Sequence, residues 1–251
     1  MTSVEELSAS YASFMLRPRA EPEVCPRCFD LVGGAEGCYP CAHYGGWVDA
    51  ASPISYSVAR GPLHRALRNY KRLSGHPAGA VTAGLAAVLW RHLELHEHCL
   101  AAAAGVGGFD VVTTVPSSDS ARGDSHPLHQ LVGELVGPVH GRYERLLWRT
   151  GADVAPHHFN IHKYEAIRRL GGRSVLLVDD TWTTGANAQS AAAALKRAGG
   201  RRVAAVVVGR YVNPGYAHNA QRLRSMPAFD WSVCAWCPDA SGSSRRAENR
   251  R

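Results

Sequence analysis

The chain has 251 residues, 45% of them hydrophobic, and a formal net charge of +7. This suits a globular protein with either one large domain or a domain and a small module. It contains no apolar run of about 18 residues and no secretory apolar segment near the N-terminus, so we expect a cytoplasmic protein without membrane contact. The basic balance suits polyphosphate or nucleic acid and does not choose between them.

Two cysteine pairs dominate the N-terminal region. Residues 1–20 form a leader that is either a short helix or disordered. Residues 21–50 then carry a C-x2-C-x9-C-x2-C pattern, made by Cys25, Cys28, Cys38 and Cys41. Four thiolates in two close pairs can surround one tetrahedral Zn²⁺, and the few core-forming residues nearby make a structural zinc ribbon the favoured interpretation. Two disulfides or free thiols are the alternatives, although a cytoplasmic location disfavours disulfides.

A basic segment follows the expected strand Ile54–Val58. Residues 63–72 have helical spacing, with Leu63, Leu67 and Tyr70 on one face. The segment is either a solvated basic face or a means of bringing Lys71 to a pyrophosphate.

A long helix is expected over Ala80–Ala104, after a break at Gly75–Gly79. Three histidines and Cys99 near its end invite a metal interpretation; they are His92, His96 and His98. Neighbouring glutamates make an exposed polar face the better prediction for them.

The apolar stretch Phe109–Val115 predicts a buried strand. A loop with small residues and an arginine follows it, containing Pro116, Ser117, Ser118 and Arg122. Ligands of open α/β sheets bind at the carboxyl ends of strands, so this loop is either an ordinary connection or a pyrophosphate contact.

The remaining elements alternate between helix and strand. A helix is expected over Leu128–Val136, a strand over Arg145–Arg149 and a final strand over Arg201–Tyr211. The polar residues 157–164 suit a mobile active-site loop. This alternation predicts an α/β fold in which helices flank a parallel sheet.

The most informative stretch is Val175–Asn187. An apolar run predicts a buried strand that ends in Asp179 and Asp180, and a polar loop then leads into an alanine-rich helix, Ala188–Ala198, with Asn187 as its expected N-cap. Free N–H groups at a helix N-terminus bind anions, so the loop suits a phosphate. The two carboxylates suit sugar hydroxyls or Mg²⁺.

These thirteen residues resemble the signature of type I phosphoribosyltransferases, which bind phosphoribosyl pyrophosphate (PRPP). The resemblance implies that a set of eight residues binds PRPP, namely Asp179, Asp180, Thr181, Thr183, Thr184, Gly185, Ala186 and Asn187. It also implies a catalytic role for the two aspartates and a pyrophosphate-side role for Lys71, Pro116, Ser117, Ser118 and Arg122.

The order of ribbon, basic helix, Val-Pro strand and PRPP signature resembles the ComF-type family, which is linked to competence for DNA uptake. The resemblance covers roughly residues 22–213. We expect a leader at 1–20, a zinc ribbon at 21–50, a phosphoribosyltransferase domain at 51–215 and a largely disordered extension at 216–251. The family's arginine before Asn160 is absent, and His157 is its nearest substitute.

The resemblance implies that PRPP, bound with Mg²⁺, donates phosphoribose to an unidentified acceptor and releases pyrophosphate. Purine-salvage relatives place an aspartate base where Thr183 stands, so a hypoxanthine or guanine acceptor is not expected. The alternative is a non-catalytic PRPP-sensing or DNA-uptake accessory protein. A homodimer is left open. A third pair, Cys234 and Cys237, is expected to be inert or to bind metal weakly, with redox activity or a shared metal as alternatives.

Overall fold

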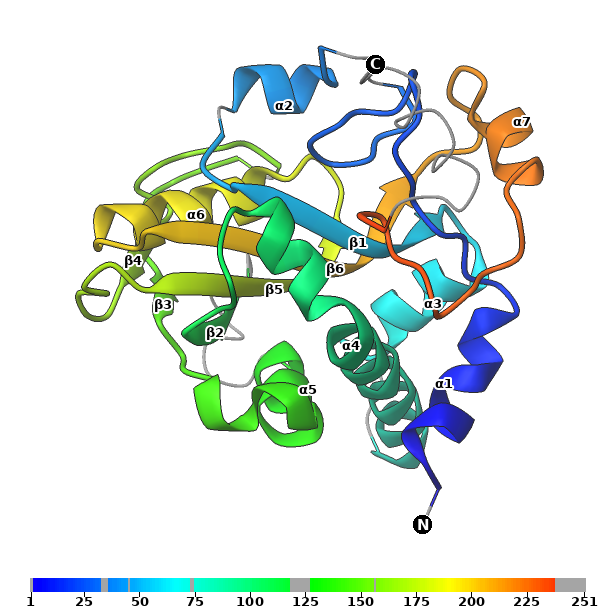
Figure 1. The fold of residues 1–251 in the computed structure, drawn as a ribbon, viewed down its shortest axis with the longest axis horizontal. Helices are drawn as coiled ribbons and strands as arrows, with labels where there is room; N and C mark the ends of the chain where they lie inside the picture. Colours follow the sequence, from blue (N-terminus) through cyan, green and yellow to red (C-terminus); the bar gives the residue numbers. More distant parts are fainter. Residues whose placement is uncertain are drawn as a thin grey trace, which may run out of the picture.

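A four-stranded parallel sheet forms the centre of the protein (Figure 1). The computed structural model describes residues 2–32, 36–44, 46–72, 75–117, 127–155 and 157–237. The strand order is β1-β6-β5-β2, and every neighbouring pair is parallel. The strands are β1 (Ala50–Val58), β2 (Val111–Thr114), β5 (Ser174–Trp182) and β6 (Arg202–Val212).

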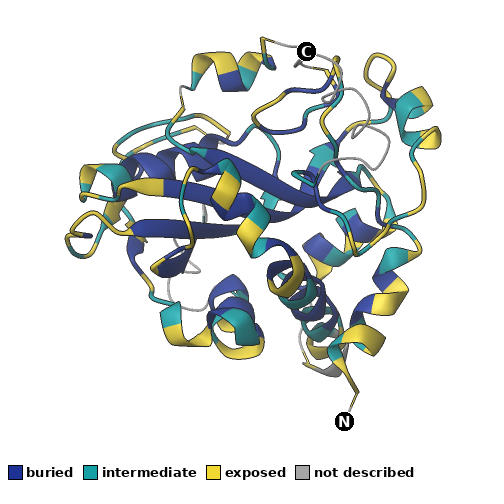
Figure 2. Cartoon of the chain, in the orientation of Figure 1, coloured by how far each residue is buried: buried dark blue, intermediate teal, exposed yellow. Residues whose placement is uncertain are grey.

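Helices cover both faces of this sheet, as the sequence predicted. On one face lie α3 (Pro62–Asn69), α4 (Gly75–Ala103) and α5 (Pro127–Leu135), and on the other lies α6 (Ala186–Arg197). Alternate side chains of β5 pack on opposite faces of the sheet. Leu176 and Val178 pack with α4 and α5, whereas Leu177 packs with α6. Both central strands are therefore almost wholly buried (Figure 2). The expected flanked parallel sheet is confirmed.

The N-terminal leader forms a helix, α1 (Val4–Ala12), which packs against α4. Ser3 and Glu6 make a reciprocal capping box that satisfies the free N–H groups of the first turn. The buried side chain of Tyr11 lies against Gly84 of α4, where a Cβ atom would come within 2.6 Å of the tyrosine ring. Of the two alternatives for residues 1–20, the structure shows the helix over Val4–Ala12.

Two expected elements lie elsewhere than predicted. The strand expected over Arg145–Arg149 is β3 (Leu147–Arg149), which pairs antiparallel with β4 (Tyr164–Ala166) in a separate two-stranded sheet. Gly75–Gly79 does not break the chain, because these residues form the first turns of α4. A glycine-containing segment can begin a helix when the following turns are held by packing, here against α1 and β1.

The short elements complete the fold. They are α2 (Tyr39–His43), a 3-10 helix η2 (Gly137–Arg142) and α7 (Asn219–Arg224). The expected disorder of the C-terminal extension does not hold for residues 216–237, which include α7 and a segment packed against α4 and β1; residues 238–251 lie outside the described part. Among the described helices, none is long and apolar enough to cross a membrane.

Candidate functional site

A cavity of about 640 Å³ opens at the carboxyl end of β5, between the N-terminus of α6 and the end of α3. It collects every predicted PRPP-binding residue, and it adds Lys71, Pro116 and Ser117 from the predicted pyrophosphate side. Ser118 and Arg122 lie outside the described residues. The other lining side chains include His64, Arg68, Arg72, His157, Trp182 and Tyr211. Residues more than 100 positions apart in the sequence therefore share one cavity.

The loop between β5 and α6 depends on a glycine in a left-handed conformation. Gly185 has φ +80° and is the N-cap residue of α6, so the predicted cap, Asn187, is wrong and lies inside the first turn. A Cβ atom on Gly185 would approach the Trp182 indole to 2.4 Å. The loop thus needs glycine for both its backbone conformation and its close contact with the tryptophan. The Thr184 hydroxyl accepts from the Ala186 N–H at 3.3 Å and donates to the His157 carbonyl at 3.2 Å.

Asp180 is buried and bound on one side by α3 and the residues that follow it. Its Oδ2 atom lies 2.5 Å from the Lys71 ammonium and accepts a hydrogen bond from the Tyr70 hydroxyl. Burial, and then the negative charge of Asp180, hold the pKa of Tyr70 well above its usual range, so this tyrosine stays protonated as a donor. Sequence reasoning placed Lys71 near the site but missed Tyr70, which had been assigned only to an apolar helix face.

Asp179 has a different environment, although it is the next residue along the strand. Burial, and then repulsion by the neighbouring Asp180 carboxylate, raise the pKa of Asp179 to about 8. Lys71 and the Asp180 N–H, which donates to the Asp179 carboxylate at 2.9 Å, only partly oppose this rise. Asp179 therefore has less positive charge and fewer hydrogen-bond donors around it than Asp180, and a ligand with hydroxyl groups and a bound cation would supply both.

This environment makes the stability of the ligand-free protein depend on pH. Because the pKa of Asp179 is higher in the folded state than in the unfolded state, its contribution to stability is present at acid pH and lost as the pH rises to about 8. We expect Asp179→Asn to remove this loss and to stabilise the protein above pH 8 by on the order of 1–3 kcal/mol. Thermal unfolding of both forms between pH 5 and 9 tests this, and parallel pH profiles would contradict it.

The Lys71–Asp180 ion pair should also contribute to stability. Lys71→Met leaves a buried carboxylate without its cation, and we expect a loss of about 1–3 kcal/mol because Lys71 is partly exposed. Arg72→Met is the matched control, since Arg72 is an exposed cation on the same cavity wall. Urea unfolding measures both, and the Lys71→Met/Asp180→Asn double variant should recover part of the loss. Equal losses of unfolding free energy in Lys71→Met and Arg72→Met would show that the Lys71–Asp180 ion pair does not stabilise the fold.

Asn187 is held by a buried lysine within the stretch that the sequence predicts as a polar loop. The Lys163 ammonium donates to Asn187 Oδ1 at 2.7 Å, and Lys163 is 2% exposed. Burial, and then the charge of Arg149, lower the pKa of Lys163. Residues 157–164, expected to form a mobile loop, thus contribute Lys163 beside the α6 N-terminus and His157 in the cavity wall.

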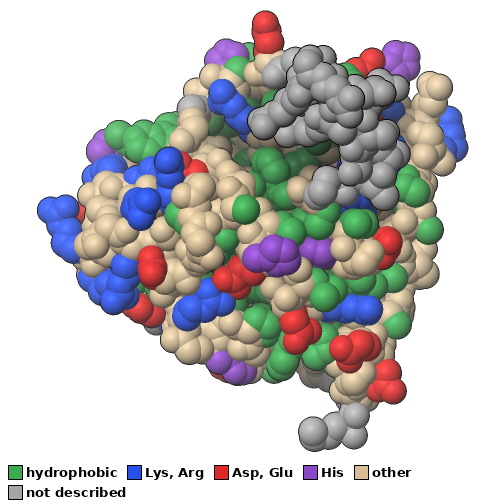
Figure 3. Space-filling model, in the orientation of Figure 1, with side chains coloured by type: hydrophobic (Ala, Val, Ile, Leu, Met, Phe, Trp, Pro, Cys, Tyr) green, Lys and Arg blue, Asp and Glu red, His purple; other side chains and the backbone are tan. Residues whose placement is uncertain are grey.

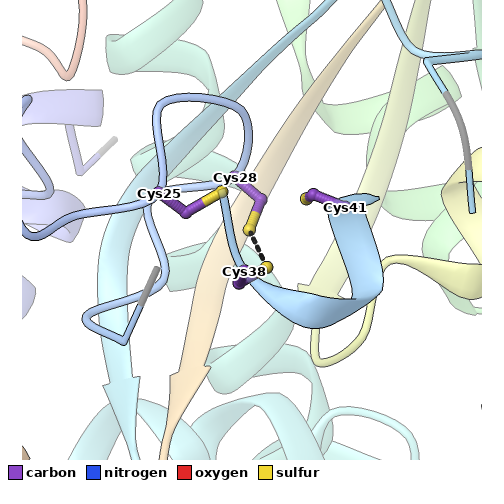
Figure 4. Close-up of side chains that lie close together, drawn as sticks. All are labelled: Cys25, Cys28, Cys38 and Cys41. Carbon is purple, nitrogen blue, oxygen red and sulfur yellow. Dashed lines mark hydrogen bonds between the residues drawn. The ribbon is translucent and has the colours of Figure 1, made fainter. Parts of the chain in front are cut away.

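The four predicted zinc ligands lie together beside the sheet (Figure 4). The sulfur atoms of Cys25, Cys28, Cys38 and Cys41 all lie within 4.8 Å of one another, and those of Cys28 and Cys38 are 3.5 Å apart. All four cysteines are buried and free of disulfides. The cluster is consistent with a zinc ribbon, because four sulfurs at these separations could hold one tetrahedral ion.

A buried arginine connects this cluster to the loop of the cavity. Arg210 of β6 is 3% exposed and forms an ion pair with Asp30 at 2.6 Å. Its guanidinium also donates to the carbonyls of Cys28 (3.1 Å), Trp182 (3.1 Å) and Thr183 (2.8 Å). The position of the polar loop is therefore tied to the cysteine cluster. Sequence reasoning gave no role to Arg210, which lies at the end of an otherwise apolar strand.

The histidines of α4 correct a further expectation. His92 and His96 are buried rather than part of an exposed polar face, at 4% and 5% exposure. His96 and Cys99 lie beside Cys234 and Cys237, a pair that had been expected to be inert or to bind metal weakly. The sequence showed each half of this second cluster but not that they meet.

No protein-family model matches the sequence, and no curated protein matches it. Among solved structures, the chain is similar to the crystal structure of purine phosphoribosyltransferase from Pyrococcus horikoshii Ot3. The two share 14% sequence identity, and the match covers 62% of this chain and 95% of that chain with a TM-score of 0.30. At this TM-score the likeness assigns no function.

Proposed function

We propose that the cavity binds PRPP with Mg²⁺ and that the chain is a phosphoribosyltransferase-like protein of the ComF type, with a type I phosphoribosyltransferase fold. The observation that carries this proposal is the composition of one cavity. It combines a helix N-terminus, an adjacent pair of carboxylates and several cationic side chains. Phosphate, sugar hydroxyls and pyrophosphate are the chemical groups that these three features bind.

The 5-phosphate would lie at the N-terminus of α6. The first N–H groups of this twelve-residue helix have no acceptor within the helix, and the helix dipole favours an anion there. Thr183 adds a hydroxyl donor, the Thr184 hydroxyl can add a second by giving up its bond to the His157 carbonyl, and Gly185 allows the backbone to come close to the phosphate. No acidic residue occupies the first turn of the helix.

The ribose hydroxyls would donate hydrogen bonds to Asp179 and Asp180. A hydroxyl that reaches Asp180 can replace Lys71, whose ammonium then becomes available to the pyrophosphate alongside Arg68 and Arg72. The high pKa of Asp179 supports a ligand that brings a cation, because this carboxylate ionises more readily beside positive charge. Mg²⁺, when bound with PRPP, would neutralise the pyrophosphate as it leaves.

The identity of the acceptor is a separate question, because Thr183 has a neutral side chain that cannot act as a carboxylate base. Thr183 lines the cavity where purine-salvage relatives carry an aspartate base, so an acceptor that needs its proton removed there is not favoured. We propose that the acceptor is an amine or a pyrimidine-type base that attacks the anomeric carbon. The bond from that carbon to the pyrophosphate oxygen breaks as the new bond forms, and the proton of the attacking nitrogen passes to the departing pyrophosphate or to water.

Calorimetric titration tests the binding part of this proposal. PRPP is expected to bind the folded protein with Mg²⁺ and to bind much more weakly after magnesium is chelated. Ribose 5-phosphate and pyrophosphate should each bind more weakly than PRPP and compete with it, because each fills only part of the cavity. Absence of PRPP binding to the folded wild type would refute the proposal.

A non-catalytic role in DNA handling is the second candidate, and basic side chains on the surface favour it. Figure 3 shows Lys and Arg side chains gathered where β3, β4 and α6 lie. Two basic residues of α6 and β6 are partly neutralised, since Lys196 and Arg202 both contact Asp49, at 3.0 and 2.9 Å. Release of pyrophosphate that depends on an added acceptor would favour the enzyme, whereas salt-sensitive DNA binding without release would favour the accessory role.

A further inference from the structure

The second cluster joins two segments that are far apart in the sequence. His96 and Cys99 lie three residues apart on one face of α4, and Cys234 and Cys237 form a C-x2-C pair near the end of the described chain. One ligand atom from each of the four residues lies within 4.8 Å of all the others. His96 and Cys234 are buried, and the two remaining cysteines are partly buried.

The separations match the edges of a tetrahedron around a zinc ion. The Cys237 sulfur lies 3.5 Å from that of Cys234 and 3.8 Å from that of Cys99. The Nδ1 atom of His96 lies 3.7 Å from the Cys237 sulfur and 4.0 Å from the Cys99 sulfur. Tetrahedral bonds of about 2.3 Å to sulfur and 2.0–2.1 Å to nitrogen put neighbouring ligand atoms roughly 3.5–3.8 Å apart. Disulfide sulfurs would instead be about 2 Å apart.

Hydrogen bonds around the cluster orient its ligands. The Nε2 atom of His96 lies 2.7 Å from the Trp231 carbonyl, which can only accept, so Nε2 carries the proton. A neutral His96 then presents the lone pair of Nδ1 to the three sulfurs, an arrangement typical of zinc-bound histidine. The Trp236 N–H points to the Cys234 sulfur at 3.3 Å and would stabilise its thiolate form.

We propose that His96, Cys99, Cys234 and Cys237 bind a second structural Zn²⁺, independently of the function of the cavity. One imidazole and three thiolates form a tetrahedral donor set that favours zinc, and the protein fills all four positions, so no site is left for a substrate. The seven cysteines of the chain would then be divided between one site with four sulfurs and one with three.

The proposed ion would fasten the C-terminal segment to the rest of the fold. Between the two cysteines, the Trp236 indole donates to the Ala51 carbonyl of β1 at 3.0 Å and packs edge-on against Phe29 at 5.4 Å between ring centroids. Phe29 directly follows Cys28 of the first cluster. The second site would thus hold α4, β1 and the first cysteine module together through one short segment.

Zinc content of the full chain, purified under reducing conditions, tests the proposal. We expect two zinc ions per wild-type chain and one in the Cys99→Ser/Cys237→Ser variant. His96→Ala should also lose one ion. His98→Ala is the matched control and should keep both, because His98 is exposed and lies on the same helix, with Nε2 3.3 Å from the Cys99 sulfur. Loss of zinc in His98→Ala but not in His96→Ala would overturn the assignment of the histidine.

A measurement on the wild type alone tests the same proposal even if the variants do not fold. Replacement of zinc by Co²⁺ gives sulfur-to-metal absorption that scales with the number of thiolate ligands. Two sites would be supported by a cobalt absorption intensity that corresponds to seven thiolate ligands. Native mass spectrometry should then show two metal ions per chain. Intensity for four thiolates with one ion, or a disulfide between Cys234 and Cys237 in the reduced preparation, would overturn the proposal.

Discussion

Magnesium-dependent binding of PRPP is expected to weaken at least about 100-fold in the Asp179→Asn/Asp180→Asn variant. Each carboxylate would accept a charge-assisted hydrogen bond from a ribose hydroxyl, and such bonds contribute about 1.5–3 kcal/mol each. Two of them correspond to roughly 100- to 10,000-fold in affinity. Calorimetric titration of PRPP into the wild type and the variant measures the change.

Two comparisons separate loss of the site from loss of the fold. Asp110→Asn is the matched control, because Asp110 accepts from the Ser174 N–H at 2.7 Å at the other end of β5 and does not line the cavity. The Asp179→Asn single variant should bind PRPP poorly while it is more stable than the wild type above pH 8. Unchanged affinity in the double variant would show that these aspartates do not hold the ligand.

Gly185→Ala is expected to cost about 2–5 kcal/mol of stability and to abolish phosphate binding at the loop. The substitution places a side chain at φ +80° and drives its Cβ atom to 2.4 Å from the Trp182 indole. The first effect costs about 1–3 kcal/mol and the second adds an overpacking cost of similar size. Urea unfolding and titration with ribose 5-phosphate measure the two consequences.

Two other glycines make this comparison quantitative. Gly172 has φ +83° but nothing within 4 Å of an added Cβ atom, so Gly172→Ala isolates the backbone cost. Gly107 has the same open space and no positive φ, so Gly107→Ala should change stability by less than about 0.5 kcal/mol. If Gly185→Ala loses no more unfolding free energy than Gly172→Ala, the contact with Trp182 does not constrain the loop.

The sequence by itself determined the parts of the site that are local along the chain. The strand, the aspartate pair, the loop and the helix N-terminus lie within Val175–Asn187, and their geometry follows from hydrophobic pattern and helix-end chemistry. The four-cysteine pattern was readable for the same reason, since each pair spans one short turn. Even within this stretch, the helix cap was predicted two residues too late, at Asn187 instead of Gly185, because the contact between Gly185 and Trp182 is a packing effect.

Only the tertiary structure decided which distant groups meet these local features. Tyr70 and Lys71 reach Asp180 because β1 and β5 belong to one parallel sheet, with β6 between them, and α3 follows β1. His96 meets Cys237 for a similar reason, since the C-terminal segment packs back onto α4. Such contacts depend on chain crossovers and on burial across more than 100 residues. Hydrophobic pattern records that a residue is buried, but not which residue it is buried against.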